Sequence, residues 1–321
     1  MLLLSLLAAA AMERVRSQQE LQDLSLLADR IEGRIQTQTS VLSFLRAFLV
    51  ANDLRIESRD IRQFLQLGGG SELTGGMRGV GVALFQPAGD VEQALSLLRA
   101  GDGDHQQIWP ETDQPYRFPI VVLEPPDTRN QAAYGYDMYT DPTRRDAMDR
   151  AWRSGRAAAS APVELVQEIT AEKQTGFLIY LPVMGADGRS IHSMVYAPYR
   201  VGDLMRMALS TPSDLGVEVR VVDAATGIVM LEPDRSVAWD ASFPITVADR
   251  EWQIDLAFRY REPLLLRPSL ITLLVGGVVA VLLQRLLRQR EKRIAAEREA
   301  AHEARQAAEL RGLLLEETRH R

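Results

Sequence analysis

The chain has 321 residues, a formal net charge of -6 at pH 7 and no cysteine. Its length allows two domains, and its ordinary apolar and charged fractions allow each of them to bury a core. The acidic balance argues against a nucleic-acid-binding protein, because phosphate binding needs Lys and Arg clustered over a broad face. Without cysteine, disulfides, thiolate nucleophiles and thiolate metal ligands are all excluded.

Residues 1–12, MLLLSLLAAAAM, are apolar but too short to cross a bilayer as a helix, which needs about 20 residues. They also lack the positive charges that begin a signal peptide. We predict that they are part of a first transmembrane helix. Residues from about Glu13 to Glu262 would then lie outside the cytoplasm, between two spans.

Residues 13–67 are predicted to form a long stalk helix and a second helix from about Asp53 to Leu67, which ends at Gly68–Gly70. Spacings of three and four residues alternate along the stalk, at Leu21, Leu24, Ala28, Ile31, Ile35, Gln38, Leu42, Leu45 and Leu49. This heptad seam predicts a helix that pairs with a second copy of the chain. The alternative is an amphipathic helix that lies along its own domain.

Strand patterns begin near Met77. The stretch GVGVALF (79–85) has one bulky face and one nearly bare face, which either a closely packed helix or a ligand could cover. A helix from about Asp90 to Ala100 and a continuous apolar strand in YRFPIVVLEP (116–125) follow. The acidic GDGDH (101–105) is predicted to be a solvated turn, because a calcium loop would need further ligands.

The stretch GYDMYTDPTRRDAM (135–148) contains two aspartates with different predicted roles. Asp141 is an N-cap followed by Pro142, and the helix ends at Gly155. Asp137 precedes this N-cap by four residues, so it is the better candidate for a functional site. The alternative is that Asp137 only accepts a hydrogen bond from a turn amide. SAPVELVQE (160–168) and GFLIYLPVM (176–184) then predict two strands.

Residues 185–262 are predicted to contain further strands, a short helix near Val201–Leu209 and a hairpin around Thr226 and Gly227.

The next segment, 264–287, carries no charge from Pro268 to Gln284 and predicts a transmembrane helix. Four basic residues follow it directly, which places the C-terminal flank in the cytoplasm. A buried core helix is the alternative. Residues 288–321 predict a loosely paired cytoplasmic coiled coil, with sevenfold spacing at Leu287, Ile294, Ala301, Ala308 and Leu315.

Several of these segments together resemble the CHASE domains, the extracytoplasmic sensor regions of receptor histidine kinases and membrane nucleotide cyclases, which include the plant cytokinin receptors. The matching segments, in order, are FPIVVLEPP, Asn130, YGYDMYTDPTRRDAM, SAPVELVQE and GFLIYLPV. The resemblance implies an α+β fold in which a long stalk helix carries two PAS-like α/β modules. We place the membrane-distal, ligand-binding module at residues 68–184 and the membrane-proximal module at residues 185–262.

The resemblance also implies where a ligand would bind. Asp137 matches the aspartate that holds the adenine ring edge in the cytokinin receptors, and Leu165 and Tyr180 match two further pocket residues. Phe118 and Met138 are added as candidate lining residues. Tyr180 replaces a smaller residue and would narrow the pocket, so only the location is carried over. The expected ligand is a small, adenine-like molecule, since a carboxylate can accept hydrogen bonds from purine N–H groups.

The C-terminal LLLEETRHR resembles the start of the phosphoacceptor box of HWE-type histidine kinases, with His320 as the phosphorylated residue. The alternative is a terminal histidine without a role. No cofactor or metal site is expected in this chain, while ATP is implied for a kinase domain beyond Arg321. The prediction is the sensor of a dimeric receptor histidine kinase in the cell's inner membrane, signalling to a cytoplasmic response regulator. A nucleotide cyclase sensor and a non-catalytic, membrane-anchored interaction protein are the alternatives.

Overall fold

The computed structural model describes residues 2–67, 76–101, 107–169, 173–210, 216–259 and 268–319. The chain forms two compact units. One consists of Leu21–Tyr260, and the other combines Met1–Glu20 with Arg261–Arg321. The predicted glycine run at 68–70, most of the acidic loop at 101–105 and His320 lie outside the described residues.

The long N-terminal helix α1 spans Leu2–Ala51. Within the larger unit, the predicted seam is buried in the domain itself, and even its polar member Gln38 is only 2% exposed, whereas Leu21 is 49% exposed. The stripe from Leu24 to Leu49 therefore packs along its own domain, as the alternative interpretation predicted. The spacing alone could not distinguish the two cases, because an apolar stripe is buried equally well by a domain surface or by a second helix.

Helix α2 spans Ser58–Leu67, five residues later than the predicted start. Asp53 and Leu54, which were expected to begin this helix, instead have φ angles of 52° and 62°. Such left-handed residues end one helix and redirect the chain before the next. Phe48 of α1 and Phe64 of α2 stack with their ring centroids 4.5 Å apart, so the two helices pack together.

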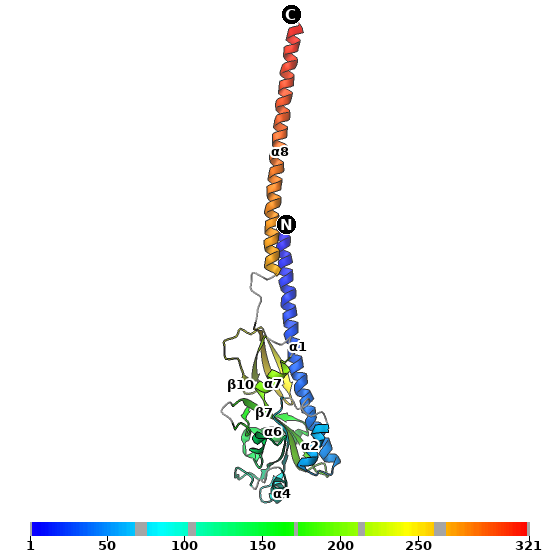
Figure 1. The fold of residues 1–321 in the computed structure, drawn as a ribbon, viewed down its shortest axis with the longest axis vertical. Helices are drawn as coiled ribbons and strands as arrows, with labels where there is room; N and C mark the ends of the chain where they lie inside the picture. The colour runs from blue at the N-terminus through cyan, green and yellow to red at the C-terminus, as the bar shows by residue number, and fades with distance from the viewer. Residues whose placement is uncertain are drawn as a thin grey trace. The chain divides into compact units, whose positions relative to one another are not determined.

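A six-stranded antiparallel sheet forms the first module of the larger unit (Figure 1). Its strands run in the order β4-β1-β8-β7-β5, with β6 also paired to β7. The strands are β1 (Val80–Leu84), β4 (Ile120–Glu124), β5 (Ala158–Ala159), β6 (Val163–Glu164), β7 (Thr175–Met184) and β8 (Ile191–Arg200). A separate pair is formed by β2 (Gln86–Pro87) and β3 (Tyr116–Arg117).

The predicted module boundary between residues 184 and 185 falls inside this sheet. Strand β8 pairs with β7 from Gly176↔Arg200 to Met184↔Ile191, and its other edge pairs with β1. The strand predicted over 160–168 is reduced to β6, at Val163–Glu164. Glu168 is instead bound by the Arg200 guanidinium, with Nη2 to Oε2 at 2.6 Å, so its end of the segment is fixed by an ion pair rather than by strand pairing.

Helices cover the two faces of the first sheet. The helices are α4 (Glu92–Ala100), α5 (Thr128–Gln131), the 3-10 turn η1 (Met138–Thr140), α6 (Pro142–Ser154) and α7 (Val201–Ala208). Tyr180 and Tyr196 are cross-strand partners and stack, so they share one face, which we call the η1 face. Glu124 lies on the opposite face, the α2 face, where Arg62 of α2 binds it through two contacts of 2.9 Å.

A four-stranded antiparallel sheet forms the second module, in the order β10-β9-β12-β11. Its strands are β9 (Val217–Asp223), β10 (Val229–Leu231), β11 (Ala241–Val247) and β12 (Arg250–Phe258). The predicted hairpin around Thr226 and Gly227 is confirmed by the pairing of β9 with β10. Gly227 has φ +70°, a conformation that glycine adopts without steric cost.

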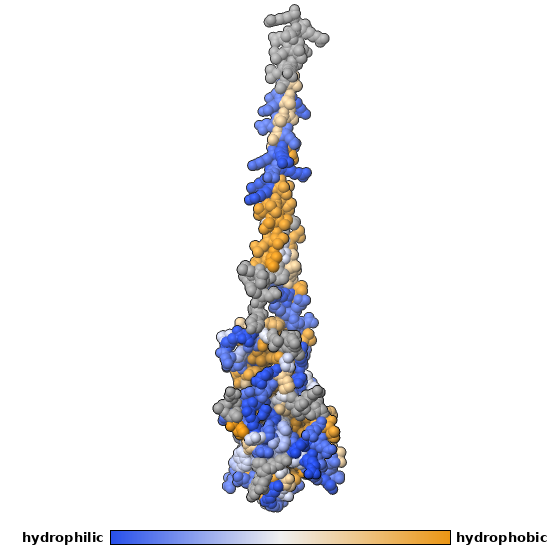
Figure 2. Space-filling model, viewed as in Figure 1, coloured by the Kyte–Doolittle hydropathy of each residue, from blue (hydrophilic) through white to orange (hydrophobic). Residues whose placement is uncertain are grey.

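The smaller unit contains α8, which spans Pro268–Arg319. Within Ser269–Gln306 it contains the one stretch in the described part of the chain that is long and apolar enough to cross a membrane, while residues 264–267 of the predicted span lie outside that part. Figure 2 shows apolar surface along the first turns of α8 and hydrophilic surface on the turns that follow, in agreement with the predicted span.

The start of α1 packs antiparallel to α8 within the smaller unit. Ser269 Oγ donates to Glu13 Oε2 over 3.0 Å, and a Cβ on Gly276 would lie 1.9 Å from Ser5 Oγ. Gly276 thus permits close helix approach, and its neighbour here is the N-terminal segment of the same chain. The first transmembrane helix itself stays a prediction.

Candidate functional site

Asp137 lies between β4 and α6, and its two carboxylate oxygens have different surroundings. Oδ1 accepts hydrogen bonds from the backbone N–H groups of Phe118, at 2.8 Å, and Tyr139, at 3.1 Å. Oδ2 is buried and has no hydrogen-bond partner among the described residues. The residue as a whole is 0% exposed. A buried acceptor without a partner is costly, so it marks a place where a ligand donor could bind.

The environment of Asp137 disfavours its charge. Burial raises the pKa of this carboxyl above its ordinary value, and the two backbone N–H groups and the Arg117 guanidinium only partly counteract that effect. Buried groups with perturbed pKa values are common at functional sites, which makes Asp137 a candidate.

Asp137 also has a structural role. Its side chain caps η1, because Tyr139 N donates to Oδ1, and Thr140 Oγ1 donates to its backbone oxygen at 2.7 Å. The alternative that Asp137 bonds a turn amide is therefore confirmed for Oδ1. Because Oδ1 accepts from both amides, Oδ2 takes no part in capping.

Three predicted lining residues meet around this aspartate. Tyr180 donates its hydroxyl to Met138 Sδ over 3.5 Å, and Met138 directly follows Asp137. Phe118, whose backbone binds Asp137, is completely buried and packs its ring 5.4 Å from that of Tyr139. Burial also raises the pKa of the Tyr180 phenol.

Leu165 lies on the same face of the sheet but at another position. A Cβ on Gly176 would be 2.5 Å from Leu165 Cγ, so this leucine occupies the space above that glycine. Gly176 and Tyr180 both belong to β7 and are four residues apart, which puts them on one face. Leu165 thus forms a wall of the same apolar region, away from Asp137.

The bare face of the strand at 79–85 is covered by an aromatic side chain. A Cβ on Gly81 would lie 2.7 Å from the ring of Tyr196, which belongs to the neighbouring strand β8. Sequence reasoning considered a helix or a ligand there and missed Tyr196. The signal was present in the alternation of SIHSMVYAPY, but only strand order brings this tyrosine beside the glycine.

Tyr196 and Arg144 add polar groups that the sequence did not predict. The Tyr196 hydroxyl is buried and has no hydrogen-bond partner among the described residues, and burial raises its pKa well above the ordinary value. Arg144 is 4% exposed and donates to the Tyr136 hydroxyl at 3.1 Å and to the Glu164 carbonyl at 2.7 Å. The η1 face therefore combines apolar walls with a few polar groups, as small-molecule sites do.

Replacing Tyr196 with phenylalanine is expected to leave the free energy of unfolding unchanged or to raise it by about 0.5–1 kcal/mol, because the lost hydroxyl has no bond to lose. Denaturant titration of the full chain would measure this effect. Tyr134→Phe is the matched control, because the Tyr134 hydroxyl is bonded to the backbone of Leu123 at 3.3 Å and its loss should cost about 1 kcal/mol. Equal losses in both variants would contradict the assignment of an unpartnered Tyr196 hydroxyl.

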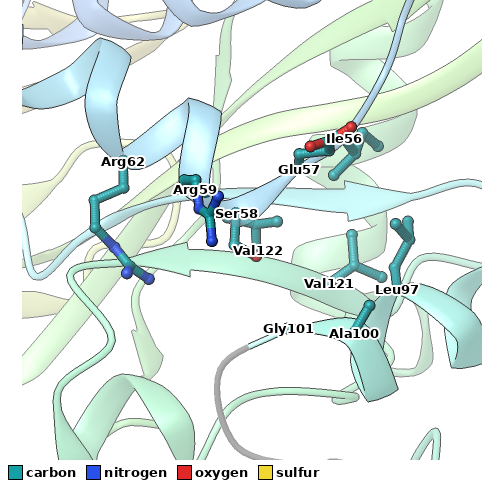
Figure 3. A pocket seen from close by; sticks show the side chains of 10 residues that line it. All are labelled: Ile56, Glu57, Ser58, Arg59, Arg62, Leu97, Ala100, Gly101, Val121 and Val122. Carbon is teal, nitrogen blue, oxygen red and sulfur yellow. The ribbon is translucent and has the colours of Figure 1, made fainter.

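A cavity of about 560 Å³ lies on the other side of the sheet (Figure 3). It is formed by the start of α2, the end of α4 and strand β4, and its lining residues include Arg59, Arg62, Leu97 and Val122. Because it belongs to the α2 face, it is separate from Asp137. Among the described residues, no group of three or more histidine, aspartate or glutamate side chains could hold a metal ion.

The geometry defines a class of protein: two antiparallel sheets on a long helix, a buried carboxylate beneath one of them, and a candidate membrane helix. The CHASE domain model matches residues 55–230, more than half of the 321 residues. The chain therefore belongs to the CHASE family, whose members are extracytoplasmic sensor domains. No curated protein sequence matches it.

Solved sensor domains are similar to the chain at low sequence identity. The ligand-binding domain of the Pseudomonas aeruginosa amino acid chemoreceptor PctC, in complex with GABA, is 13% identical with a TM-score of 0.45, over 72% of this chain and 94% of that one. The periplasmic sensory domain of Campylobacter jejuni Tlp1 is 8% identical with a TM-score of 0.47, over 73% and 92%. An extracellular ligand-binding receptor from Desulfohalobium retbaense is 12% identical with a TM-score of 0.47, and the match covers 73% of this chain but 39% of the receptor.

Proposed function

We propose that this chain is the input part of a transmembrane receptor whose first module binds a small molecule on the η1 face. The observation that carries this proposal is Oδ2 of Asp137, a buried acceptor without a partner among the described residues. Membership of the CHASE family supports the same role, because it is a family of sensor domains.

The side chains indicate the chemistry of the ligand. Asp137 Oδ2 requires a hydrogen-bond donor, and a purine-like N–H pair would satisfy it. The rings of Phe118 and Tyr180 and the side chain of Leu165 offer an apolar environment, and all three are at most 2% exposed. The rings of Tyr180 and Tyr196 fill part of this face, so entry of a ligand requires them to move. The proposed ligand is a small, planar molecule with an adjacent N–H donor and an apolar remainder.

The proposed output is a histidine kinase. In this arrangement residues 1–12 belong to a first transmembrane helix, residues 264–287 form the second, and residues 288–321 lead as a paired helix into a phosphoacceptor box at His320. A kinase domain beyond Arg321 would bind ATP and act on a response regulator. The uninterrupted course of α8 from Pro268 to Arg319 supports a helical path for the signal.

The proposed state of the receptor is a homodimer in the inner membrane. A ligand would shift this dimer between two helix packings only by the difference in its affinity for them, about 1.4 kcal/mol per factor of ten. A cyclase output would use the same sensor, and the two outputs differ only in the catalytic domain that would lie beyond Arg321.

A thermal-shift screen of the full chain in detergent against purines and other small metabolites tests the ligand proposal. For a compound that raises the melting temperature, Asp137→Ala should weaken binding by about 10–150-fold, the equivalent of a charge-assisted hydrogen bond of about 1.5–3 kcal/mol. Arg59→Ala, in the cavity on the α2 face, is the control and should bind as the parent does. Loss of binding in the Arg59 variant with retention in the Asp137 variant would move the site to that cavity.

A further inference from the structure

Strand β5 is a two-residue strand at the edge of the first sheet, next to the proposed ligand site. Ala158 is the cross-strand partner of Tyr180, and Ala159 is the partner of Ile179. The described strand order ends at β5. So short a strand has few backbone hydrogen bonds of its own. The adjoining Ser160 adds two bonds to Leu178 of β7, through its amide at 2.8 Å and its hydroxyl at 3.0 Å, and side chains supply the rest.

Side chains from two different elements bind the backbone of Ala159. Asp249 Oδ1 accepts from Ala159 N at 2.8 Å, and Arg150 Nη2 of α6 donates to the Ala159 carbonyl at 2.7 Å. Arg150 Nη1 also forms an ion pair with Asp249 Oδ2. These three contacts close a ring, which we call the β5 clasp.

Asp249 belongs to the second module, in the turn that joins β11 to β12. Val247 and Arg250 are paired across this turn, so only Ala248 and Asp249 connect the strands. Ala248 has φ +54°, a left-handed conformation that costs free energy in a residue with a Cβ. Such strain persists only where the surrounding contacts hold it, and the bonds of Asp249 to Ala159 and Arg150 are contacts of that kind.

We propose that Asp249, from the second module, and Arg150, from α6 of the first, are positioning residues of the ligand site that hold β5 and its partner Tyr180 in place. This inference rests on the proposed function, because it describes how a structural change caused by a ligand on the η1 face is passed to β12. Strand β12 precedes α8 in the chain. A ligand that moves Tyr180 displaces β5, and β5 is bonded to the β11–β12 turn. Coupling of this kind requires an element with two arrangements whose populations depend on both sites, here the η1 face and the β11–β12 turn. The β5 clasp, which is either formed or open, is that element.

Hydrogen exchange of the full chain in lipid nanodiscs tests the clasp without any ligand. Asp249→Ala is expected to speed exchange at the Ala159 amide at least tenfold and also at Leu178–Leu181 of β7. Asp249→Asn retains an acceptor and should restore protection at Ala159. Asp234→Ala, at an exposed position of the second module, is the control and should change neither segment.

A change at the ligand site, measured at the β11–β12 turn, separates coupling between the two modules from a local structural role of Asp249. Met138→Ala, which removes the contact with Tyr180, should speed exchange across the β11–β12 turn at least threefold in the parent chain but not in the Asp249→Ala background. Equal responses in both backgrounds, or an effect of Asp249→Ala confined to Ala159, would overturn the coupling. Neither result bears on whether Asp137 binds a ligand, so failure of this inference remains distinct from failure of the proposed function.

Discussion

Replacing Asp223 with alanine is expected to lower the free energy of unfolding by about 3–5 kcal/mol, the cost of leaving one member of a buried ion pair alone. Asp223 is completely buried at the end of β9. Its two oxygens accept from Arg250 Nε at 2.9 Å and Nη2 at 2.6 Å, and Oδ2 also accepts from the Thr226 amide at 3.1 Å. The variant would lose the pair and the fixed turn together. Denaturant unfolding of the full chain, followed by tryptophan fluorescence, measures the loss.

The pH dependence of this effect has a definite sign. Burial alone would raise the pKa of Asp223, but the hydrogen bonds from Arg250 and Thr226 outweigh burial and lower it below the ordinary value. The stabilisation is therefore present above the unfolded-state pKa of about 3.9 and is lost as pH falls through the lower folded-state pKa. The difference between parent and variant should shrink below about pH 4.

Two further variants control this prediction. Asp234→Ala lies in an exposed part of the same module and should change stability by no more than about 0.5 kcal/mol. The double variant Asp223→Ala with Arg250→Met removes both charges and should recover part of the loss, because no unpaired charge stays buried. If the double variant were less stable than Asp223→Ala alone by a further 3 kcal/mol, the ion pair would not be the cause.

Replacing Asp137 with asparagine is expected to separate binding from stability. The amide oxygen can still accept from Phe118 N and Tyr139 N, so η1 keeps its cap. The amide NH₂ takes the place of Oδ2, so two hydrogen-bond donors, this NH₂ and the N–H of the ligand, face each other and cannot bond. We expect binding of a screening hit to weaken by about 100-fold, while the free energy of unfolding at pH 7 rises by an amount on the order of 1 kcal/mol, since a carboxylate charge that burial disfavours is removed.

The contribution of Asp137 to stability changes with pH in the opposite direction to that of Asp223. Burial raises the pKa of Asp137, so the folded chain favours the protonated form and loses stability as pH rises from the unfolded-state value through the higher folded-state value. Asp137→Asn should therefore match the parent near pH 3.5 and exceed it at pH 7. Asp141→Asn, which alters the N-cap of α6 four residues away, should show no such gain. A parent chain that is more stable than Asp137→Asn at pH 7 would contradict the expected gain.

Local patterns were sufficient for several elements. The helix from Pro142 to Ser154 has the predicted limits, because Asp141 accepts from the amides of Thr143 and Arg144 and Gly155 adopts φ +67°. Strand β7 and the β9–β10 hairpin also agree with the predicted patterns. In each case residues close in sequence supply the cap, the turn or the alternation that defines the element.

Other features depend on residues far apart in sequence. No local pattern encodes contacts between residues that are far apart in sequence. Three features depend on such contacts: the burial of the α1 stripe, the pairing of β8 with both β7 and β1, and the contact of Tyr196 with Gly81. Arg144 is 4% exposed, and only the tertiary structure places this helix arginine in the interior.

The sequence by itself determined the class of this protein: an acidic, cysteine-free chain with a candidate membrane helix and the motifs of the CHASE family, with Asp137 singled out because it was not needed to cap the helix after it. The tertiary structure decided how that aspartate is bonded, since it assigned Oδ1 to η1 and left Oδ2 buried without a partner among the described residues. The physical reason is that hydrogen-bond satisfaction and burial depend on which strands meet. Strand order is set by the packing of the whole module rather than by any one segment.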